Sequence, residues 1–535
     1  MKGQCLPFTQ IPHSTRLFLD YLSYSPPIRA FYPRSPLFPE WVKDEAPKVR
    51  YDESRRRSVS DILERQNRGW GSGAKTLTNI DRLRRGALAV VTGQQVVLFG
   101  GPLFSIFKAL TAVKLAERAT AEGVETVPIF WLATEDHDLA EVNHVSLLSE
   151  AGMPEMVATD SHSVTDAPVG EVQLGPEIVP VLDRVASLLG ESEVTNSLRE
   201  SYTPGQTLGT GFARLFARLF QDWGVILLDP SDPELHQVAA PIFKSAIERS
   251  SEIDEALLVR GKELEAAGYH QQVKVTPATT LLFGVREGAR TAIRRKNGGF
   301  TIGTEPIAGD ELARAVAAHP ENFNPNVLLR PVIQDYLLPT LTYTGGSAEV
   351  AYFAQVGVVY ERLLGRVTPV LPRFSATLVE PKPQRILERY RLTLSDLFHG
   401  PEKVRERIAA QSMPADLKQT FEDAKTSLDK SMNAIRESLT RLDPTLTDAA
   451  VNASAKMHYQ LTQLEARAAR AESLRNDVIS RHADALSSAL FPNKVLQERE
   501  IAGVSFLARY GTGLLNDLYQ MIHADCNDHQ IVEMQ

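Results

Sequence analysis

Two clusters of polar side chains, each placed just after a short apolar run, have residue types that could do chemistry. The first follows the run at 87–91 and consists of Thr92, Gly93, Gln94 and Gln95. The second follows the run at 126–132 and contains Glu135, Asp136, His137 and Asp138. Glutamine and threonine side chains orient ligands by hydrogen bonds, and a histidine among carboxylates can act as a general base. The two clusters therefore predict a binding or catalytic site.

The acidic cluster has three interpretations. If the residues after it are helical, His137, Glu141 and His144 share one helical face and could hold a divalent metal ion. Alternatively, His137 is a general base, tuned by Asp136 or Asp138, that deprotonates an amine or a thiol. In the third interpretation the acidic residues only cap a helix. The spacing matches no standard metalloprotease signature, so we expect no metal.

Two glycine pairs extend the candidate site. Gly100-Gly101 precedes an apolar helical pattern, and the backbone N–H groups of such a helix end suit a carboxylate or a phosphate. Lys108 lies about two turns farther along, which places it away from that end. Gly345-Gly346 ends a further predicted strand within 326–356, with Glu349 in the first turn of the next helix. A plain glycine turn into a helix explains the same residues equally well.

The elements that must position these residues form an α/β pattern. The runs at 87–91, 126–132 and 224–229 are almost continuously apolar, which is typical of parallel strands buried on both faces. An amphipathic helical pattern at 101–119 separates the first two runs, so they form a βαβ unit. Ligands bind at the carboxyl ends of such strands, so both polar clusters should face one crevice. We interpret residues from about 150 to 330 as insertions in this sheet.

The pattern changes after residue 385. Apolar residues recur at alternating spacings of three and four from 417 to 442 and again from 457 to 478. Pro444 interrupts the pattern between these two series, because proline cannot continue a helix. The sequence therefore predicts an α/β core at 1–385 and a helical domain at 386–535, built around an antiparallel coiled-coil hairpin.

The totals exclude several classes of protein. The chain has 535 residues and a formal net charge of −8, which gives no general attraction to nucleic acid or to anionic membranes. It contains no apolar stretch of membrane-spanning length and no signal-peptide pattern. Its only two cysteines, Cys5 and Cys526, lie near opposite ends. This usage predicts a soluble cytoplasmic protein without a disulfide framework or a cysteine-based zinc site.

Six stretches, in this order, resemble the cysteine ligase family of bacillithiol biosynthesis. They lie at residues 11–22, 88–109, 127–145, 226–236, 327–355 and 490–500, and include VTGQQVVLFGGP, FWLATEDHDLAEVNH and LTYTGGSAEVAYFAQ. The resemblance spans nearly the whole chain. It implies a Rossmann-like core similar to that of class I aminoacyl-tRNA synthetases, a C-terminal coiled coil and a homodimer. The implied reaction adds L-cysteine to glucosaminyl-malate and completes bacillithiol.

The resemblance also assigns residues to the active-site crevice. They are Thr92, Gly93, Gln94, Gln95, Glu135, Asp136, His137, Asp138, Asn143, His144, Tyr343, Gly345, Gly346 and Glu349. This chain departs from the family pattern at Val97, where a glycine is usual, and at Phe104, where a tyrosine is usual. The second departure removes a hydroxyl group, and with it any hydrogen bond made from that position.

Amide formation from a free carboxylate is uphill in water, so the implied reaction needs an activated cysteine carboxylate. We expect ATP with Mg²⁺ to supply it through an acyl-adenylate, although the synthetase signatures H-I-G-H and K-M-S-K-S and the Walker motif are absent. Polar groups near the join of the two domains could hold the phosphates. They are Lys382, Gln384, Arg385, Asn493, Lys494, Gln497 and Arg499. Solvated surface is the alternative interpretation of this set.

The leading hypothesis is therefore a cysteine-adding ligase. In it, the residues at 92–95 and 100–101 hold the substrates, and His137 deprotonates the glucosamine amine or orients it through Asp136 or Asp138. The alternative is a non-catalytic scaffold with a synthetase-like core and a partner-binding coiled coil. A tRNA-binding relative of the synthetases is disfavoured by the negative net charge and by the missing signatures.

Overall fold

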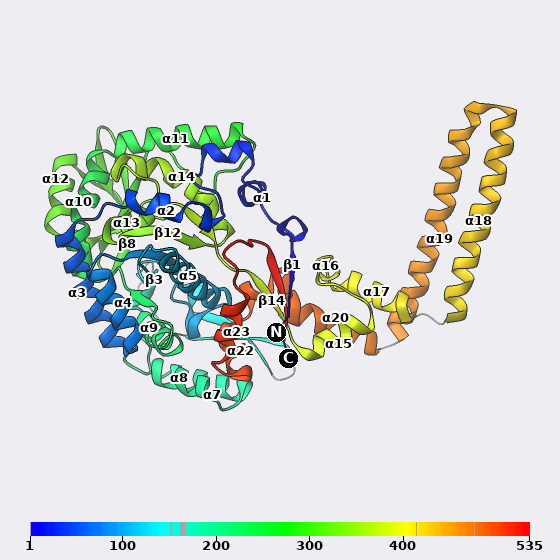
Figure 1. Cartoon of the computed structure of the whole chain (residues 1–535), viewed down its shortest axis with the longest axis horizontal. Helices are drawn as coiled ribbons and strands as arrows, with labels where there is room; N and C mark the ends of the chain where they lie inside the picture. Colours follow the sequence, from blue (N-terminus) through cyan, green and yellow to red (C-terminus); the bar gives the residue numbers. More distant parts are fainter. Residues whose placement is uncertain (1, 150–151, 161–166, 413–414, 476, 535) are drawn as a thin grey trace. The chain divides into compact units, whose positions relative to one another are not determined.

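The computed structural model describes residues 2–149, 152–160, 167–412, 415–475 and 477–534. The chain forms two compact units (Figure 1). Unit 1 comprises Gly3–Thr377 and Glu498–Gln530, and unit 2 comprises Lys2, Leu378–Gln497 and Ile531–Gln535. These units differ from the predicted division at residue 385. The main segment of unit 2 begins at Leu378, and Glu498–Gln530 belong to unit 1 and not to the helical unit.

The centre of unit 1 is a five-stranded parallel sheet with the strand order β13-β12-β2-β3-β6. Its strands are β2 (Leu88–Gln94), β3 (Thr126–Leu132), β6 (Ile226–Leu228), β12 (Thr340–Gly345) and β13 (Val370–Pro372). The chain runs outward from β2 to β6 on one side and from β12 to β13 on the other. The strand order thus reverses between β2 and β12, which is where open α/β sheets bind ligands. The predicted α/β class and the three predicted strands are confirmed.

Helices cover both faces of this sheet because its strands are apolar on both faces. On one face, α5 (Phe104–Ala121) packs Ala112 and Ala116 against Val90 and Leu341. The other face packs against α3 (Glu53–Trp70), α10 (Pro233–Glu248), α13 (Arg330–Leu337) and α14 (Ser347–Leu363). Helix α14 is buried without interruption from Val350 to Tyr360, so it is held firmly behind the end of β12.

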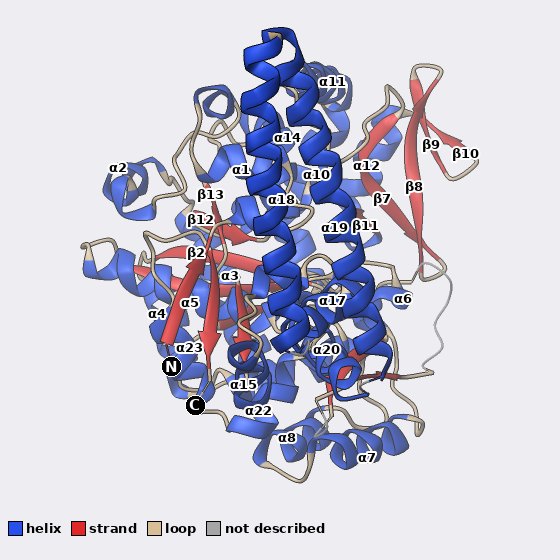
Figure 2. Ribbon diagram, turned by 90° about the vertical axis from the view of Figure 1, so that its right-hand side faces the viewer, coloured by secondary structure: helices blue, strands red, loops and turns tan. Residues whose placement is uncertain are grey.

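Insertions extend the core between β3 and β6 and between β6 and β12. A β-hairpin is formed by β4 (His144–Leu148) and β5 (Pro154–Ala158). An antiparallel sheet has the order β10-β9-β8-β7-β11 (Figure 2). Its strands are β7 (Thr279–Arg286), β8 (Ala289–Lys296), β9 (Gly299–Ile302), β10 (Glu305–Ile307) and β11 (Phe323–Pro325). Of the two further strands that the sequence suggests in this part of the chain, 279–288 corresponds to β7, whereas 270–275 forms no strand.

The long helices of unit 2 are α18 (Ala415–Leu442) and α19 (Thr447–Arg475), joined by a short turn at Pro444–Leu446. Lys425 pairs with Glu465 at 2.8 Å, and Asp429 pairs with His458 at 2.7 Å. Partners that advance on one helix while receding on the other show that the helices are antiparallel. The predicted helical hairpin is confirmed, including its break at Pro444.

The remaining elements are shorter or lie away from the central sheet. The other helices are α1 (Arg16–Leu22), α2 (Val42–Glu45), α4 (Ala74–Arg84), α6 (Leu139–Val142), α7 (Ile178–Leu189), α8 (Glu193–Ser201), α9 (Leu208–Leu219), α11 (Ser250–Ala266), α12 (Gly309–Ala318), α15 (Pro381–Arg389), α16 (Leu394–Leu397), α17 (Pro401–Ser412), α20 (Asp477–Leu490), α21 (Gln497–Glu500), α22 (Gly503–Tyr510) and α23 (Leu514–Met521). Strands β1 (Lys2–Leu6), β15 (His529–Glu533) and β14 (Ala376–Val379) form a small sheet in that order. Across the described residues, no helix combines the length and the apolar character needed to span a bilayer.

Candidate active site

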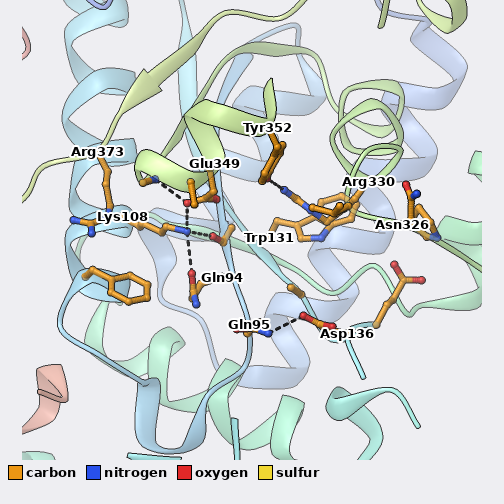
Figure 3. A pocket seen from close by; sticks show the side chains of 18 of the residues that line it. Gln94, Gln95, Lys108, Trp131, Asp136, Asn326, Arg330, Glu349, Tyr352 and Arg373 are labelled. Carbon is orange, nitrogen blue, oxygen red and sulfur yellow. Dashed lines mark hydrogen bonds and ion pairs between the residues drawn. The ribbon is translucent and has the colours of Figure 1, made fainter. Parts of the chain in front are cut away.

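A cavity of about 410 Å³ opens at the carboxyl ends of β2, β3 and β12 (Figure 3). The strand register explains why the polar clusters meet there. Gln94 lies opposite Leu132, and Tyr343 lies opposite Val91, so the three strands end at nearly the same level. Predicted site residues that line the cavity are Gly93, Gln94, Gln95, Glu135, Asp136, Gly346, Glu349 and Arg499.

Lys108 connects two of the strand ends at the floor of this cavity (Figure 3). Its ammonium group donates to the carbonyl oxygen of Gly93 at 2.6 Å and to Oε1 of Gln94 at 2.9 Å. It also pairs with Oε2 of Glu349 at 2.6 Å. Three acceptors use its three protons, so Lys108 positions Gln94 and Glu349 instead of binding a ligand itself. The sequence-based placement of Lys108 away from the site is wrong, because its side chain points back toward the start of α5.

The pair of Lys108 and Glu349 is buried, and burial dominates its electrostatics. Burial lowers the pKa of Lys108 to about 8, and the Glu349 carboxylate offsets part of that effect. Burial alone would raise the pKa of Glu349, but the Lys108 cation lowers it overall. Glu349 also accepts hydrogen bonds from the Tyr343 hydroxyl and, at 2.8 Å, from the Gly346 N–H. Glu349 is therefore held as a carboxylate.

Among the charged residues that line the cavity, cations outnumber acids. Five cations, Lys108, Arg290, Arg330, Arg373 and Arg499, face three acids, Glu135, Asp136 and Glu349. The ring of Phe104 lies 5.1 Å from the guanidinium carbon of Arg373, and the corresponding distance for Arg499 is 5.9 Å. This excess of positive charge suits a ligand that carries more than one anionic group.

Two buried donors in the cavity wall have no hydrogen-bond partner among the described residues. They are Nε of Arg373 and the indole N–H of Trp131. The other guanidinium nitrogens of Arg373 donate to Glu498, with Nη2 at 2.7 Å from Oε1. Arg330 donates to the Tyr352 hydroxyl at 2.7 Å. Since buried donors are normally satisfied, these two groups are candidates for direct ligand contact.

Only part of the acidic cluster lines the cavity. Asp136 lines the cavity, and its Oδ2 accepts a hydrogen bond from the Gln95 amide at 2.7 Å. His137 is 42% exposed at the side chain and does not line the cavity. Its Nδ1 lies 2.9 Å from Nη1 of Arg290, which can only donate, so this ring nitrogen is an acceptor. Asp138 accepts from the Glu141 N–H at 3.2 Å and caps α6.

The conditional prediction of a helical metal face is wrong. Helix α6 is a single turn, and His144 begins strand β4, so His137, Glu141 and His144 share no helical face. The part of the chain that the structure describes contains no group of three histidine, cysteine or acidic residues placed to hold a metal ion.

Gly100 and Gly101 do not offer the predicted anion-binding N–H groups. The Gly100 N–H donates to the Val97 carbonyl at 3.2 Å, and the Gly101 N–H donates to the Leu98 carbonyl at 3.1 Å. Both glycines have positive φ angles, 84° and 70°, so they form a tight turn that precedes α5. Neither lines the cavity. The local turn consumes the donors that the sequence pattern left open.

Several other predicted residues support the cavity from outside it. Thr92 is fully buried and donates to the Thr344 carbonyl at 2.8 Å, which joins β2 to β12. A Cβ atom at Gly345 would lie 2.8 Å from Cβ of Glu349, so glycine there lets the first turn of α14 close over the end of β12. Asn143 and His144 are hydrogen-bonded to each other at 3.2 Å and do not line the cavity.

The proposed phosphate-binding set is divided between the units. Arg499 belongs to unit 1 and lines the cavity, whereas Lys382, Gln384, Arg385, Asn493, Lys494 and Gln497 belong to unit 2. The Gln497 side chain is buried and bonded to the backbone of Leu378 and Ala489. Gln384 donates to Glu388 on the same helix at 3.0 Å. Both polar atoms of the Gln497 side chain are thus bonded to backbone, and because the residue is buried it is not the solvated surface of the alternative interpretation.

His236 was not predicted from the sequence as a site residue. Its Nε2 lies 2.9 Å from the Glu135 carboxylate, and its Nδ1 lies 2.9 Å from the Pro320 carbonyl. Burial alone would lower the pKa of His236, but these acceptors raise it, so Glu135 faces a histidine that favours its cationic form. The sequence signal for His236 is its position in the stretch at 226–236, one of the six that resemble the ligase family.

These observations define a class of protein: a Rossmann-like core whose switch-point crevice is rich in cations and mixed with carboxylates. Two family models match the chain, "Bacillithiol biosynthesis BshC, N-terminal Rossmann-like domain" at residues 1–374 and "Bacillithiol biosynthesis BshC, C-terminal coiled-coil domain" at residues 376–534. The chain belongs to the BshC family of bacillithiol biosynthesis.

Curated relatives agree with this assignment over the full length. A protein of Koribacter versatilis, named "Putative cysteine ligase BshC", is 47% identical over 534 residues that cover 100% of both chains. Proteins with the same name from Solibacter usitatus and Salinibacter ruber are 36% and 33% identical. The first of these matches covers 99% of this chain and 100% of its relative, and the second covers 96% of each.

Proposed function

We propose that this protein joins L-cysteine to glucosaminyl-malate by an amide bond and so forms bacillithiol. The observation that carries the proposal is the charge pattern of the switch-point cavity. Its five cations and three acids suit a substrate that combines the two carboxylates of malate with the amine of glucosamine. Family membership and the names of the relatives support the same reaction.

Arg330 would hold the malate group. It lines the cavity, and its hydrogen bond to the Tyr352 hydroxyl behind it fixes its orientation. A guanidinium whose orientation is fixed in advance loses little conformational entropy when it binds a carboxylate. The unpartnered Trp131 N–H is available to a sugar hydroxyl or to a carboxylate oxygen.

Asp136 would orient the glucosamine amine and accept its proton. It is the acid in the cavity that the Gln95 amide holds in place, whereas Glu135 is already paired with His236. His137 is less suited to this role within the proposal, because its Nδ1 already accepts from Arg290 and its side chain does not line the cavity. When the amine nitrogen attacks the activated cysteine carboxyl carbon, a C–N bond forms, the activating group leaves, and the amine loses one proton.

ATP with Mg²⁺ would supply the activation of the cysteine carboxylate. The residues present fit a phosphate chain in part, since Arg373 has a buried N–H without a partner and Arg499 lies beside it in the cavity wall. Within the proposal, these two arginines would hold the phosphates.

The direct test is product formation from glucosaminyl-malate and L-cysteine with and without Mg·ATP, measured by mass spectrometry. Bacillithiol formed only with ATP would support the ligase, and bacillithiol formed without ATP would refute the ATP requirement. No product under either condition would favour the alternative, a non-catalytic binding protein.

A matched pair of variants tests the role of Asp136. Asp136→Asn should lower kcat by about 10²-fold or more, because it removes a proton acceptor from the cavity. Asp138→Asn makes the same chemical change two residues away, at the cap of α6, and should leave kcat nearly unchanged. If His137→Ala loses as much activity as Asp136→Asn, the proton acceptor is His137 and our assignment is wrong.

We further propose a homodimer formed through the helical hairpin of unit 2. Large apolar side chains of the hairpin are exposed, among them Leu442 at 78%, Leu464 at 56% and Met457 at 47%. Exposed apolar side chains gathered along a coiled coil are typical of a protein–protein interface. Analytical ultracentrifugation should find a dimer, and substitution of Leu442 and Leu464 by Glu should give a monomer with an unchanged circular dichroism spectrum.

A further inference from the structure

The two cysteines of the chain, 521 positions apart in the sequence, are neighbours in the structure. Cys5 lies in β1 and Cys526 lies in the loop between α23 and β15, and their sulfur atoms are 3.6 Å apart. Both residues belong to unit 1. The pairing of β1 with β15 brings these two distant parts of the chain together.

Both sulfur atoms are accessible, and one side chain donates to both of them. Cys5 is exposed and Cys526 is partly exposed, so small molecules can reach both. The buried Gln530 side chain places its amide nitrogen 3.6 Å from Sγ of Cys5 and 3.7 Å from Sγ of Cys526. An N–H donor shared by two sulfurs stabilises a negative charge on either one.

We propose that Cys5 and Cys526 form a dithiol site that exchanges with the small disulfides of cysteine and its derivatives. In the first step, one protein thiolate attacks a sulfur of the small disulfide, forms a mixed disulfide and releases one small thiol. In the second step, the other protein thiol loses its proton and attacks the protein sulfur of the mixed disulfide, which releases the second small thiol. The protein dithiol is oxidised by two electrons, and the small disulfide is reduced to two thiols.

The oxidised form would fasten β1 to a segment that supports the active-site cavity. Cys526 borders a small second cavity of about 20 Å³, and Arg373 borders the same cavity. Three residues after Cys526, His529 contacts the hydroxyl groups of Ser375 and Thr377, each at less than 3 Å. The Ser375 hydroxyl in turn donates to Glu498, the partner of Arg373. The exchange site therefore lies directly behind one wall of the cavity.

The exchange rate should depend on pH. Burial raises the pKa of Cys5, and the adjoining Cys526 thiol raises it further. Because only a thiolate attacks a disulfide, closure of the bond should accelerate as the pH rises from 7 to 9. Replacement of Gln530 by Met, which is of similar size but has no N–H group, should slow closure several-fold at a fixed pH.

The test uses the reduced full-length protein and cystine, without glucosaminyl-malate or ATP. After acid quenching and alkylation of the remaining thiols, digestion without reductant should yield one peptide pair joined through Cys5 and Cys526. The denatured protein should migrate faster on a non-reducing gel, because the bond closes nearly the whole chain into a ring, and dithiothreitol should reverse the shift. Cys5→Ser and Cys526→Ser should each stop at a mixed disulfide with one cysteine.

The proposal is overturned if the wild-type protein carries two separate cysteine adducts, forms disulfide-linked dimers, or does not react with cystine. A crosslink measured in this way is independent of the proposed function, because no substrate of the ligase reaction other than a cysteine derivative is present. If the crosslink forms while bacillithiol synthesis fails, the exchange site stands and the ligase proposal does not.

Discussion

The buried ion pair between Arg373 and Glu498 offers the most demanding test of how the C-terminal segment supports the active site. Only 5% of the Arg373 side chain and 2% of the Glu498 side chain are exposed. The guanidinium group of Arg373 donates twice to the Glu498 carboxylate, from Nη2 to Oε1 at 2.7 Å and from Nη1 to Oε2 at 3.2 Å. Glu498 also accepts from the Ser375 hydroxyl and from the Ala376 N–H, each at 2.9 Å. Every oxygen of this carboxylate is therefore hydrogen-bonded.

Glu498→Gln keeps the size and shape of the side chain but leaves the Arg373 cation buried without a counter-charge. The pKa of Glu498 shows the strength of the pairing: burial alone would raise it, yet the Arg373 guanidinium lowers it overall. Removal of one partner from a buried, hydrogen-bonded ion pair costs about 3–5 kcal/mol. We expect unit 1 to lose roughly that much of its free energy of unfolding.

Urea unfolding followed by tryptophan fluorescence measures this loss in the correct unit. The four tryptophans of the chain are Trp41, Trp70, Trp131 and Trp223, and all of them lie in unit 1. The matched control is Asp310→Asn, which makes the equivalent change in a salt bridge with Arg314 whose side chains are 72% and 71% exposed. The control should not shift the unfolding midpoint measurably, because solvent screens an exposed pair.

Two outcomes would refute this reasoning. If Glu498→Gln shifts the midpoint no more than Asp310→Asn does, the buried pair contributes no net stability to unit 1. If the double variant Arg373→Met, Glu498→Leu is less stable than Glu498→Gln, an unpaired buried charge is not the source of the loss. The double variant should in either case be inactive, since Arg373 lines the cavity.

Three further predictions concern charge in and behind the cavity. Burial lowers the pKa of Lys108 to about 8, so its ion pair with Glu349 should be lost as the pH rises through 8. We therefore expect kcat/KM to fall in this pH range. In Lys108→Arg the fall in kcat/KM should occur at a higher pH. Burial lowers the pKa of His529 to about 4 from 6.5, so the unfolded chain binds a proton first. The contribution of neutral His529 to the free energy of unfolding should be fully present above pH 6.5 and should fall by about 3 kcal/mol as the pH falls to 4. Urea unfolding measures this loss, which should be smaller in His529→Asn. Arg330→Met should raise KM for glucosaminyl-malate about tenfold or more, whereas Tyr352→Phe, which removes only the hydrogen bond to Arg330, should raise it less.

Local patterns were sufficient for the framework of the site. The apolar runs that became β2, β3 and β6 are read from a few consecutive residues, because a strand covered on both faces needs apolar side chains throughout. The polar residues after β2 and β3 then meet because parallel strands end at the same edge of the sheet. Pro444 likewise marked the hairpin turn, since proline excludes a continuous helix there.

Local patterns failed where a short segment had two physically acceptable conformations. The residues after Glu135 are polar enough for a helix of several turns, yet the chain forms a single turn, α6, and enters β4 at His144. At Gly100-Gly101 the sequence matched an open helix end, but the two N–H groups bond within their own turn. In both places tertiary packing selected among conformations of similar local free energy.

By itself, the sequence determined the class of the fold, the strand ends that carry the site and the helical hairpin, since each depends on residues close together in the chain. Only the tertiary structure decided which charges share the cavity. Arg373 meets Glu498 across 125 positions, and Cys5 meets Cys526 across 521. No periodicity links such positions, because their contact depends on where the C-terminal segment packs. Long-range packing, which maximises burial while pairing each buried charge, placed these residues side by side.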